Sequence, residues 1–221
     1  MYEIRLAEVE GQHWYDCHLL RSIVRYPSVT TILGAYPKGE KFYEWVAKHG
    51  ADSEAIKREA GDVGHTIHTA IESIIREKHL PGLSLADSIT IAAFREWYEK
   101  TKPIPVCCER KIVSASHAYA GTTDLVCLIN GQTCLVDYKT SNFISIPYWL
   151  QVNAYAVALE EMGLGPIERL AILHLNRSYP AGYKFLVRRP SPVLFDQFLR
   201  TYDTWRFDRE NGKSANSGDT L

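Results

Sequence analysis

The dipeptide Asn130-Gly131 constrains the fold of this chain more than any other segment. It joins residues 125–129, LVCLI, to residues 132–136, QTCLV, and both runs are rich in apolar and β-branched residues. A two-residue turn of type I′ needs positive φ at both central positions, which Asn and Gly tolerate best. We therefore expect an antiparallel hairpin in which Ile129 faces Gln132, and this pairing fixes the register of both strands.

The expected register brings two carboxylates together. It places Asp124 directly opposite Asp137, and like charges in that position destabilise a sheet. Lys139 shares the face of Asp137, one side-chain repeat along the strand. An isolated Asp-x-Lys tripeptide usually forms only a structural ion pair. Here the second carboxylate favours a site for a divalent cation. The cation would neutralise the negative charge that remains when Lys139 compensates only one of the two carboxylates.

The remaining pattern predicts strands and helices in alternation. Apolar and β-branched runs predict strands over residues 1–9, 13–20, 106–114, 121–129, 132–140, 169–176 and 183–189. Helical spacing is expected over residues 51–78, with an interruption near Gly61 and Gly64, and over 86–100, 148–161 and 193–209. A short helix is expected around Ile32. Strands mixed with helices indicate an α/β fold built in layers.

Composition limits the setting of the protein. With 221 residues, 46% of them apolar, the chain suits one medium-sized domain. Five cysteines form no evident paired framework, and neither a signal peptide nor a membrane-spanning run is recognisable, so we expect a cytoplasmic protein without a membrane partner. The net charge of -1 is unusual for a duplex-binding protein. It remains compatible with a nuclease whose bound cations reverse the local charge.

Three motifs together resemble the PD-(D/E)xK nuclease superfamily, in particular its RecB-like branch. They are Gly121-Thr122-Thr123-Asp124, then Asp137-Tyr138-Lys139-Thr140-Ser141, then Gln151 and Tyr155 four residues apart on a helix. Upstream, the segment from Gly64 to His68 is similar to the G-x-x-x-H element of the same branch. The run YPSVTTIL at 26–33 is similar to phage-encoded exonucleases and to the mitochondrial genome maintenance exonuclease group.

The resemblance implies a fold and a domain organisation. The fold would be a restriction-endonuclease-like αβα core, a central mixed sheet flanked by helices, with an N-terminal elaboration. Residues 1–50 would be strands and a helix packed on the core, and residues 51–210 the nuclease core. The small polar residues of 211–221 predict a disordered tail. The protein would be intracellular, and a phage origin would suit it.

The resemblance also implies roles for individual residues. Asp124, Asp137 and Lys139 would be catalytic, and Mg²⁺ or Mn²⁺ would be held by His68, Asp124, Asp137 and the backbone carbonyl of Tyr138. Gln151 and Tyr155 would contact the substrate or brace the catalytic strand.

Several further residues leave alternatives open. Glu72, one helical turn after His68, is either an additional ligand or a solvated charge, and Glu109 is either a third carboxylate of the site or an ordinary strand residue. Four further cations either contact phosphates of the substrate or are solvated surface charges: Lys111, Arg177, Arg188 and Arg189.

The implied activity is metal-dependent hydrolysis of DNA, in the manner of an exonuclease, on DNA with a single-stranded portion or a free end. Some relatives hold an iron–sulfur cluster through four cysteines, but no cysteine follows Cys134, so no such cluster is expected. Two other functions remain open: a nucleic-acid-binding module of the same fold that has lost catalysis, or a zinc hydrolase that uses His65, His68 and Glu72. The oligomeric state is not implied.

Overall fold

The expected hairpin forms the centre of the fold. In the computed structural model, which describes residues 3–19 and 22–215, Asn130 and Gly131 have φ of 52° and 76°. Strands β5 (Tyr119–Ile129) and β6 (Gln132–Lys139) pair in the expected register, from Ile129 opposite Gln132 to Leu125 opposite Val136. Asp124 and Asp137 are the next residues on the two strands, directly beyond the last pair of the ladder.

The hairpin lies within a mixed five-stranded sheet. The order is β4-β5-β6-β7-β8, completed by β4 (Ile104–Ser114), β7 (Arg169–Leu175) and β8 (Tyr183–Arg188). All neighbours are antiparallel except β6 and β7, which run parallel and are joined by helix α5 (Ile146–Glu161). A parallel pair requires such a crossover.

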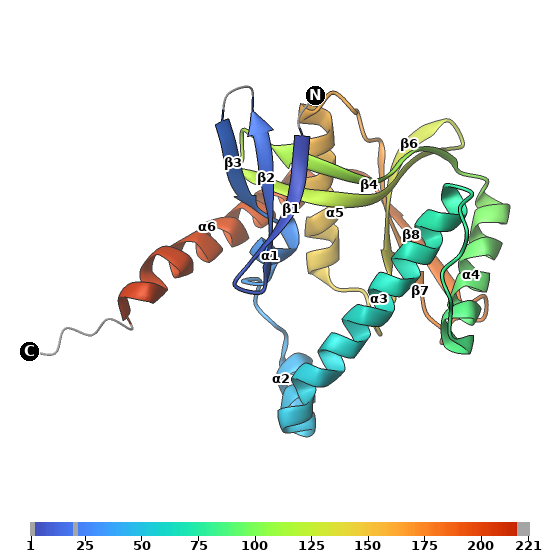
Figure 1. Ribbon diagram of the computed structural model, residues 1–221, viewed down its shortest axis with the longest axis horizontal. Helices are drawn as coiled ribbons and strands as arrows, with labels where there is room; N and C mark the ends of the chain where they lie inside the picture. Colours follow the sequence, from blue (N-terminus) through green and yellow to red (C-terminus); the bar gives the residue numbers. More distant parts are fainter. Residues whose placement is uncertain (1–2, 20–21, 216–221) are drawn as a thin grey trace, which may run out of the picture.

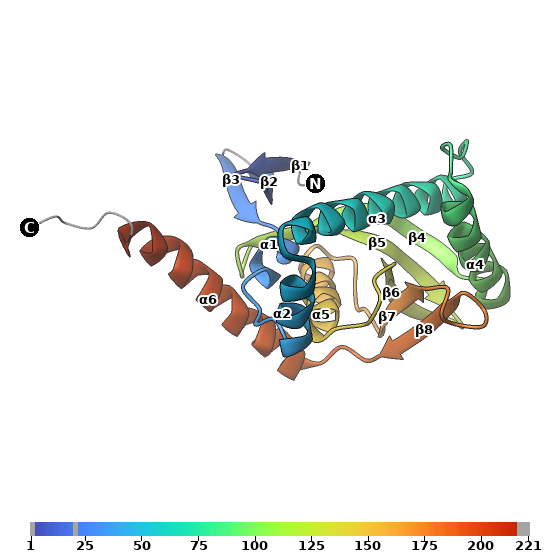
Figure 2. The ribbon, with the colours of Figure 1, turned by 90° about the horizontal axis from the view of Figure 1, so that it is seen from below.

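Helices cover both faces of the sheet, as Figure 2 shows. On one face α5 packs together with α6 (Pro192–Ala215) and the short α1 (Val29–Leu33), where Ser28 caps the N-terminus of α1. On the other face α3 (Ser53–Ile75) and α4 (Leu85–Thr101) cover an apolar layer around Tyr138, Phe94 and Trp97. The expected α/β fold with a central mixed sheet between helices is therefore confirmed.

An N-terminal antiparallel sheet elaborates this core. Strands β1 (Glu3–Val9), β2 (Gln12–Leu19) and β3 (Ser22–Pro27) form it, and its Ile4, Tyr15 and Cys17 pack on the central sheet (Figure 1). The sequence predicted the first two strands but not β3. It also did not predict helix α2 (Glu40–His49) and the 3₁₀ turn η1 (Gly50–Asp52) that lead into α3.

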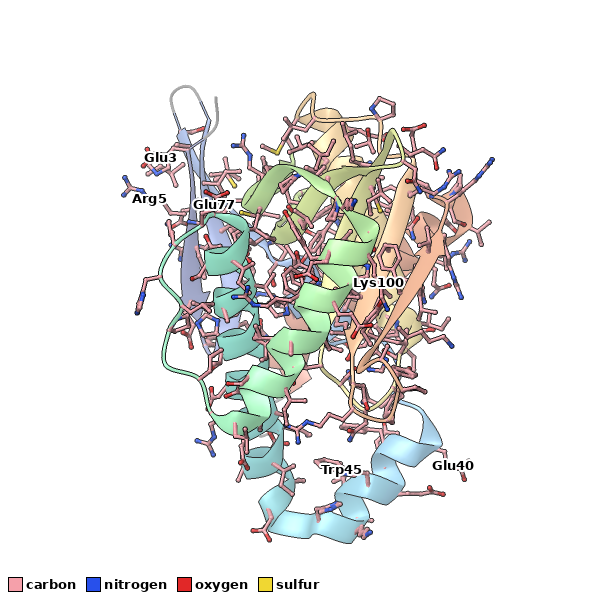
Figure 3. All side chains as sticks on the ribbon, turned by 90° about the vertical axis from the view of Figure 1, so that its right-hand side faces the viewer. Glu3, Arg5, Glu40, Trp45, Glu77 and Lys100 are labelled. Carbon is pink, nitrogen blue, oxygen red and sulfur yellow. The ribbon has the colours of Figure 1, made fainter. Side chains whose placement is uncertain are left out.

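Helix α2 stands apart from the sheet. Its Trp45 lies on the side toward α3 (Figure 3), where the Lys57 ammonium is 6.0 Å from the Trp45 ring centre and 4.9 Å from that of Phe42. Cation–π contacts therefore help to hold α2 against the first turns of α3.

The expected interruption of α3 is wrong, because the helix runs unbroken through Gly61 and Gly64. Glycine weakens a helix by only about 1 kcal/mol, and packing of the later turns on the sheet compensates this.

At the other end of the chain, α6 continues to Ala215, and residues 216–221 of the expected tail lie outside the described residues. No helix in the described part of the chain is long and apolar enough to cross a bilayer.

The central turn provides a test of the fold. Gly131→Ala places a Cβ in the left-handed region, so we expect a loss of about 1–2 kcal/mol in the free energy of unfolding, measured with urea. Gly82→Ala is the control, because a Cβ there meets open space at ordinary φ. Equal stability of both variants would contradict a type I′ turn at Asn130-Gly131.

Candidate active site

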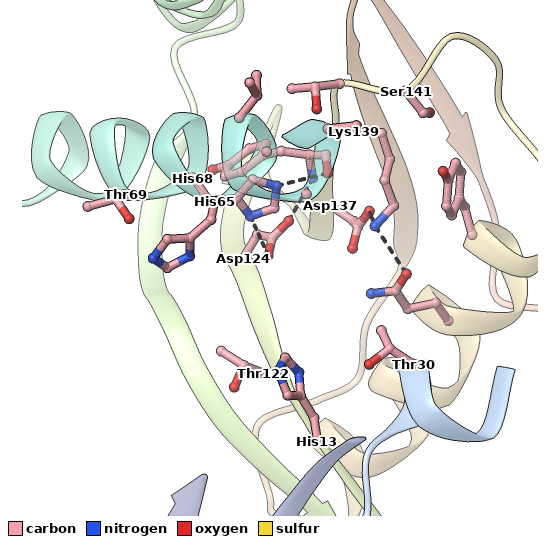
Figure 4. A pocket seen from close by; sticks show the side chains of 18 of the residues that line it. His13, Thr30, His65, His68, Thr69, Thr122, Asp124, Asp137, Lys139 and Ser141 are labelled. Atoms are coloured by element: carbon pink, nitrogen blue, oxygen red, sulfur yellow. Dashed lines mark hydrogen bonds and ion pairs between the residues drawn. The ribbon is translucent and has the colours of Figure 1, made fainter. Parts of the chain in front are cut away.

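A cavity of about 1060 Å³ opens beyond the end of the β5–β6 ladder. One wall is α3, the opposite wall carries residues of the N-terminal sheet such as His13 and Tyr15, and Asp124, Asp137 and Lys139 lie at its base (Figure 4). Thus the end of the central hairpin, and not a surface loop, presents the charged groups to this cavity.

Asp124 is held by a backbone amide and an imidazole. Its side chain is buried, and its Oδ2 accepts a hydrogen bond of 2.7 Å from the amide of Tyr138. The other oxygen, Oδ1, lies 3.3 Å from Nδ1 of His68. Burial favours the neutral acid, but His68, then Lys139 and the Tyr138 amide, outweigh it and keep the pKa of Asp124 below its usual value.

His68 reaches this carboxylate from the middle of α3. Its Nε2 lies 3.2 Å from the carbonyl oxygen of Tyr138, so the ring bridges that carbonyl and the carboxylate of Asp124. Burial opposes the charged ring, yet the attraction and hydrogen bond of Asp124 outweigh it and raise the pKa of His68 to about 9. In the metal-free protein at neutral pH both ring nitrogens therefore donate hydrogen bonds.

Asp137 pairs with Lys139 on the same strand. The ammonium Nζ lies 2.7 Å from Oδ2 of Asp137 and donates a 3.1 Å hydrogen bond to Oε1 of Gln151. Burial raises the pKa of Asp137 to about 6. The charge of Lys139 lowers this pKa, and the charge of Asp124 raises it further. Burial disfavours the ammonium, but the two carboxylates outweigh it and raise the pKa of Lys139, which stays protonated.

Gln151 and Tyr155, both on α5, connect Lys139 to Gly121 on strand β5. Nε2 of Gln151 donates to the Tyr155 hydroxyl at 3.0 Å, while its Oε1 accepts from Lys139. The Tyr155 ring lies against Gly121, where a Cβ would come within 2.5 Å of ring atom Cε1. This contact explains why a glycine stands three residues before Asp124.

Glu109 joins the site through an unusual backbone. It belongs to β4, between the pairs Cys108 opposite Leu125 and Arg110 opposite Thr123, which places it across from Asp124. Its φ of 49° costs a residue other than glycine about 1–2 kcal/mol. Ligand atoms of His68, Glu109 and Asp124 all lie within 4.8 Å of one another. Burial, then the charge of Asp124, raises the pKa of Glu109 to about 7.

The other histidine and glutamate weighed from the sequence lie elsewhere around the cavity. Glu72 forms an ion pair of 2.8 Å with Arg76, and His65 is exposed, although both line the cavity. In the described ranges, the group of close ligand atoms contains His68 with Glu109 and Asp124. Asp137, expected as a ligand, is outside this group, as are His65 and Glu72. The structure thus gives no support to a zinc site of His65, His68 and Glu72.

Two residues that the sequence did not single out hold the edges of the site. The hydroxyl of Tyr15, on β2, is 2.9 Å from Oγ1 of Thr122, two residues before Asp124. His174 is buried on β7 and contacts the carbonyl of Ser141 at 2.5 Å and the Tyr179 hydroxyl at 2.9 Å. The contacts of Tyr15 with Thr122 and of His174 with Ser141 join segments far apart in sequence, so no local pattern could have indicated them.

The donor set suits a divalent cation. Three carboxylates, Glu109, Asp124 and Asp137, surround one imidazole and one ammonium, and burial raises the pKa of Glu109 and of Asp137. A cation held by carboxylate oxygens would relieve this repulsion, and oxygen ligands with one imidazole suit Mg²⁺ or Mn²⁺. A backbone carbonyl bonded to the second nitrogen of His68 is the usual partner of a metal-ligating histidine.

Comparison with known proteins gives only distant likenesses. The chain matches no family model, and no curated protein matches it. LHK-Exo in complex with dAMP is similar over 87% of this chain and 95% of that chain, with 10% identity and a TM-score of 0.46. An alkaline exonuclease (LHK-Exo) from Laribacter hongkongensis has the same coverage and TM-score at 8% identity. The likeness to SSO0001 covers 55% of this chain and 57% of the SSO0001 chain, at 12% identity and a TM-score of 0.35.

The contact of His68 with Asp124 predicts a pH-dependent stability in the presence of chelator. Since the pKa of His68 rises from 6.5 to about 9 on folding, its contribution is complete below about pH 6.5 and disappears as pH rises through 9. Urea unfolding of wild type and His68→Gln should therefore show a stability gap that narrows over this range. His65→Gln controls for removal of an imidazole from the same helix. A gap that widens toward high pH would refute the ion pair.

The contact of Tyr155 with Gly121 predicts that Gly121→Ala is destabilising. Overpacking should lower the free energy of unfolding by about 1–3 kcal/mol. The loss should shrink in a Tyr155→Leu background, which removes the ring, and persist with Tyr155→Phe, which keeps it. Gly64→Ala is the control, because a Cβ there meets Thr140 at an ordinary 3.6 Å. The same loss in all three backgrounds would disprove the contact.

Proposed function

We propose that this protein is a metal-dependent nuclease that hydrolyses phosphodiester bonds of DNA. One observation carries the proposal: Asp124 and Asp137 are buried beside each other, and each has its own cationic partner, at the base of a cavity. An arrangement that served only stability would replace these charges with apolar groups at little cost. Retention of the charges beside an open cavity suits a reaction centre.

His68, Asp124 and Asp137, with Glu109 and the carbonyl of Tyr138 beside them, would hold Mg²⁺ or Mn²⁺. When bound, the cation polarises the scissile phosphate and lowers the pKa of a coordinated water. Asp124 and Asp137 are fixed before any ligand arrives, because the Tyr138 amide and the Lys139 ammonium already bind them. Such preorganisation lowers the cost of reaching the reactive arrangement.

Lys139 supplies a positive charge beside Asp137, as His68 does beside Asp124. Its Nζ lies 2.7 Å from Oδ2 of Asp137, donates to Oε1 of Gln151 and is 4.7 Å from the centre of the Tyr148 ring, which also lines the cavity. In hydrolysis the water oxygen bonds to phosphorus and gives up one proton, the bond from phosphorus to the leaving oxygen breaks, and the leaving oxygen takes up one proton. Lys139 orients the water or balances the negative charge that develops on the phosphate. Gln151 and Tyr155 position Lys139 for this role.

The resemblance of the motifs to the RecB-like branch supports DNA as the substrate and an exonuclease as the mode of action. We propose that the substrate enters with a single-stranded portion or a free end. Residues 51–210 would form the catalytic core, and the N-terminal segment would supply the opposite wall of the cavity through His13 and Tyr15.

Cleavage assays with matched variants test the proposal. Labelled linear single- and double-stranded DNA, circular DNA and RNA are incubated with Mg²⁺, Mn²⁺, Zn²⁺ or chelator. We expect cleavage of linear DNA with Mg²⁺ or Mn²⁺, and a loss of at least about a hundredfold in Asp137→Asn and Lys139→Met. Asp196→Asn and Lys100→Met, which change exposed ion-paired residues on α6 and α4, should keep full activity.

Circular dichroism and thermal unfolding verify that all four variants fold. DNA binding without cleavage under every metal would indicate a binding module instead of an enzyme. Cleavage with Zn²⁺ alone would contradict the proposed metal, and undiminished cleavage by folded Lys139→Met would remove Lys139 from the mechanism.

A further inference from the structure

The charges of the cavity are unfavourable for a polyanion. Among the described residues that line it, Lys139 and the protonated His68 face five carboxylates: Glu59, Glu72, Glu109, Asp124 and Asp137. One or two divalent cations would neutralise the carboxylates at the base, but they leave little positive charge for phosphates farther along a strand. Affinity for DNA rests mainly on contacts between cations and phosphates. These contacts must therefore lie outside the cavity.

Exposed cations lie along the β8 edge of the central sheet. Lys184, Arg188 and Arg189 are exposed, and within residues 3–19 and 22–215 none of them has a carboxylate within 4.0 Å. The other cations weighed from the sequence are placed differently: Lys111 is on the opposite edge strand, β4, and Arg177 donates to the carbonyl of Ala86.

The register places Lys184 and Arg188 on the catalytic face, and Arg189 follows directly after the end of β8. Lys184 is opposite His174, which is opposite Lys139, so two strand spacings, about 10 Å, separate the backbones of the two lysines. Side chains alternate along a strand, so Lys184 and Arg188 share the face of Leu186. Leu186 packs toward α5, on the same side of the sheet as Leu135 and Ile172. Lys139 and Asp137 share that face.

A second pocket connects this edge to the active site. It has a volume of about 270 Å³ and lies between the start of α5 and β8, lined by Ile144, Ser145, Ile146, Trp149, Leu186, Val187 and Arg188. The segment 141–148 borders both pockets, because Ser141 and Tyr148 line the catalytic cavity while Ile144 and Ile146 line this one. A strand that leaves the cavity across this segment reaches Arg188.

Two aromatic contacts suit this path to a single strand. The Arg188 guanidinium lies 4.3 Å from the centre of the buried Trp149 ring, which fixes its plane and leaves its N–H groups available for a phosphate. Phe143, on the segment between the two pockets, is 67% exposed, and an exposed ring beside a cationic track can stack with a base.

We propose that the DNA strand continues from the active site over Phe143 to the β8 edge, where Lys184, Arg188 and Arg189 bind its phosphates. This inference rests on the proposed nuclease function and adds the surface that supplies affinity. This track, which consists of Phe143, Lys184, Arg188 and Arg189, is separate from the catalytic groups. Its loss therefore weakens binding of a long strand and leaves the chemistry of cleavage intact.

Binding of single-stranded DNA tests the track in the presence of Ca²⁺, which carboxylate oxygens bind, and a gel verifies that the strand stays intact. Fluorescence anisotropy is measured over a range of salt concentrations, with one oligonucleotide that only fills the cavity and one long enough to reach β8. Lys184→Gln/Arg188→Gln/Arg189→Gln should reduce the salt slope for the long strand by about 2, since each phosphate contact on a single strand contributes about 0.7. The short strand should bind as to wild type. Phe143→Ala should weaken binding of the long strand without changing its slope.

Arg200→Gln and Lys100→Gln are the controls, because both remove exposed cations that are ion-paired on other helices. A long-strand slope equal to wild type in the triple variant would overturn the track, even if wild type cleaves DNA. An equal drop for the short strand would also overturn it. A reduced slope for the long strand alone, in a protein that cleaves no DNA with Mg²⁺ or Mn²⁺, would overturn the proposed nuclease and leave the track in place.

Discussion

Two ion pairs at the end of the β5–β6 ladder determine the arrangement of the whole site. Asp124 and Asp137 are both buried, and a buried carboxylate without a partner is strongly destabilising. His68 comes to Asp124 from α3, and Lys139 lies two residues beyond Asp137 on β6. The positions of α3 and of the strand end are therefore linked, because neither carboxylate is tolerated without its cation.

The two helix layers support these pairs in different ways. Helix α3 brings His68 to the carbonyl of Tyr138, whose side chain lies in the apolar layer beneath α3 and α4. Helix α5 brings Gln151 to Lys139 from the other face. The N-terminal sheet adds the hydrogen bond of Tyr15 to Thr122. Three separate parts of the fold thus converge on a few residues of β5 and β6, which makes the charged cluster rigid.

Local sequence predicted the parts of this arrangement that depend on local geometry. The Asn130-Gly131 turn gave the register, and the register placed Asp124 beside Asp137. The spacing of Gln151 and Tyr155 indicated a shared helical face, which the structure shows. Sequence predicted an interruption at Gly61 and Gly64 because glycine weakens isolated helices, whereas tertiary packing keeps α3 continuous. Contacts of Tyr15 and His174 depend on long-range packing and had no local pattern. Glu109 was undecided, since strand glutamates are common and its left-handed backbone is visible only in the structure.

The backbone of Glu109 has a consequence for how this chain tolerates substitution. Its positive φ is a conformation that glycine or asparagine adopts with less strain, and burial of its carboxylate opposes ionisation. Selection for thermal stability alone would therefore drive position 109 toward Gly or Asn. A glutamate there indicates selection for something other than stability, and stabilising designs should leave this position unchanged.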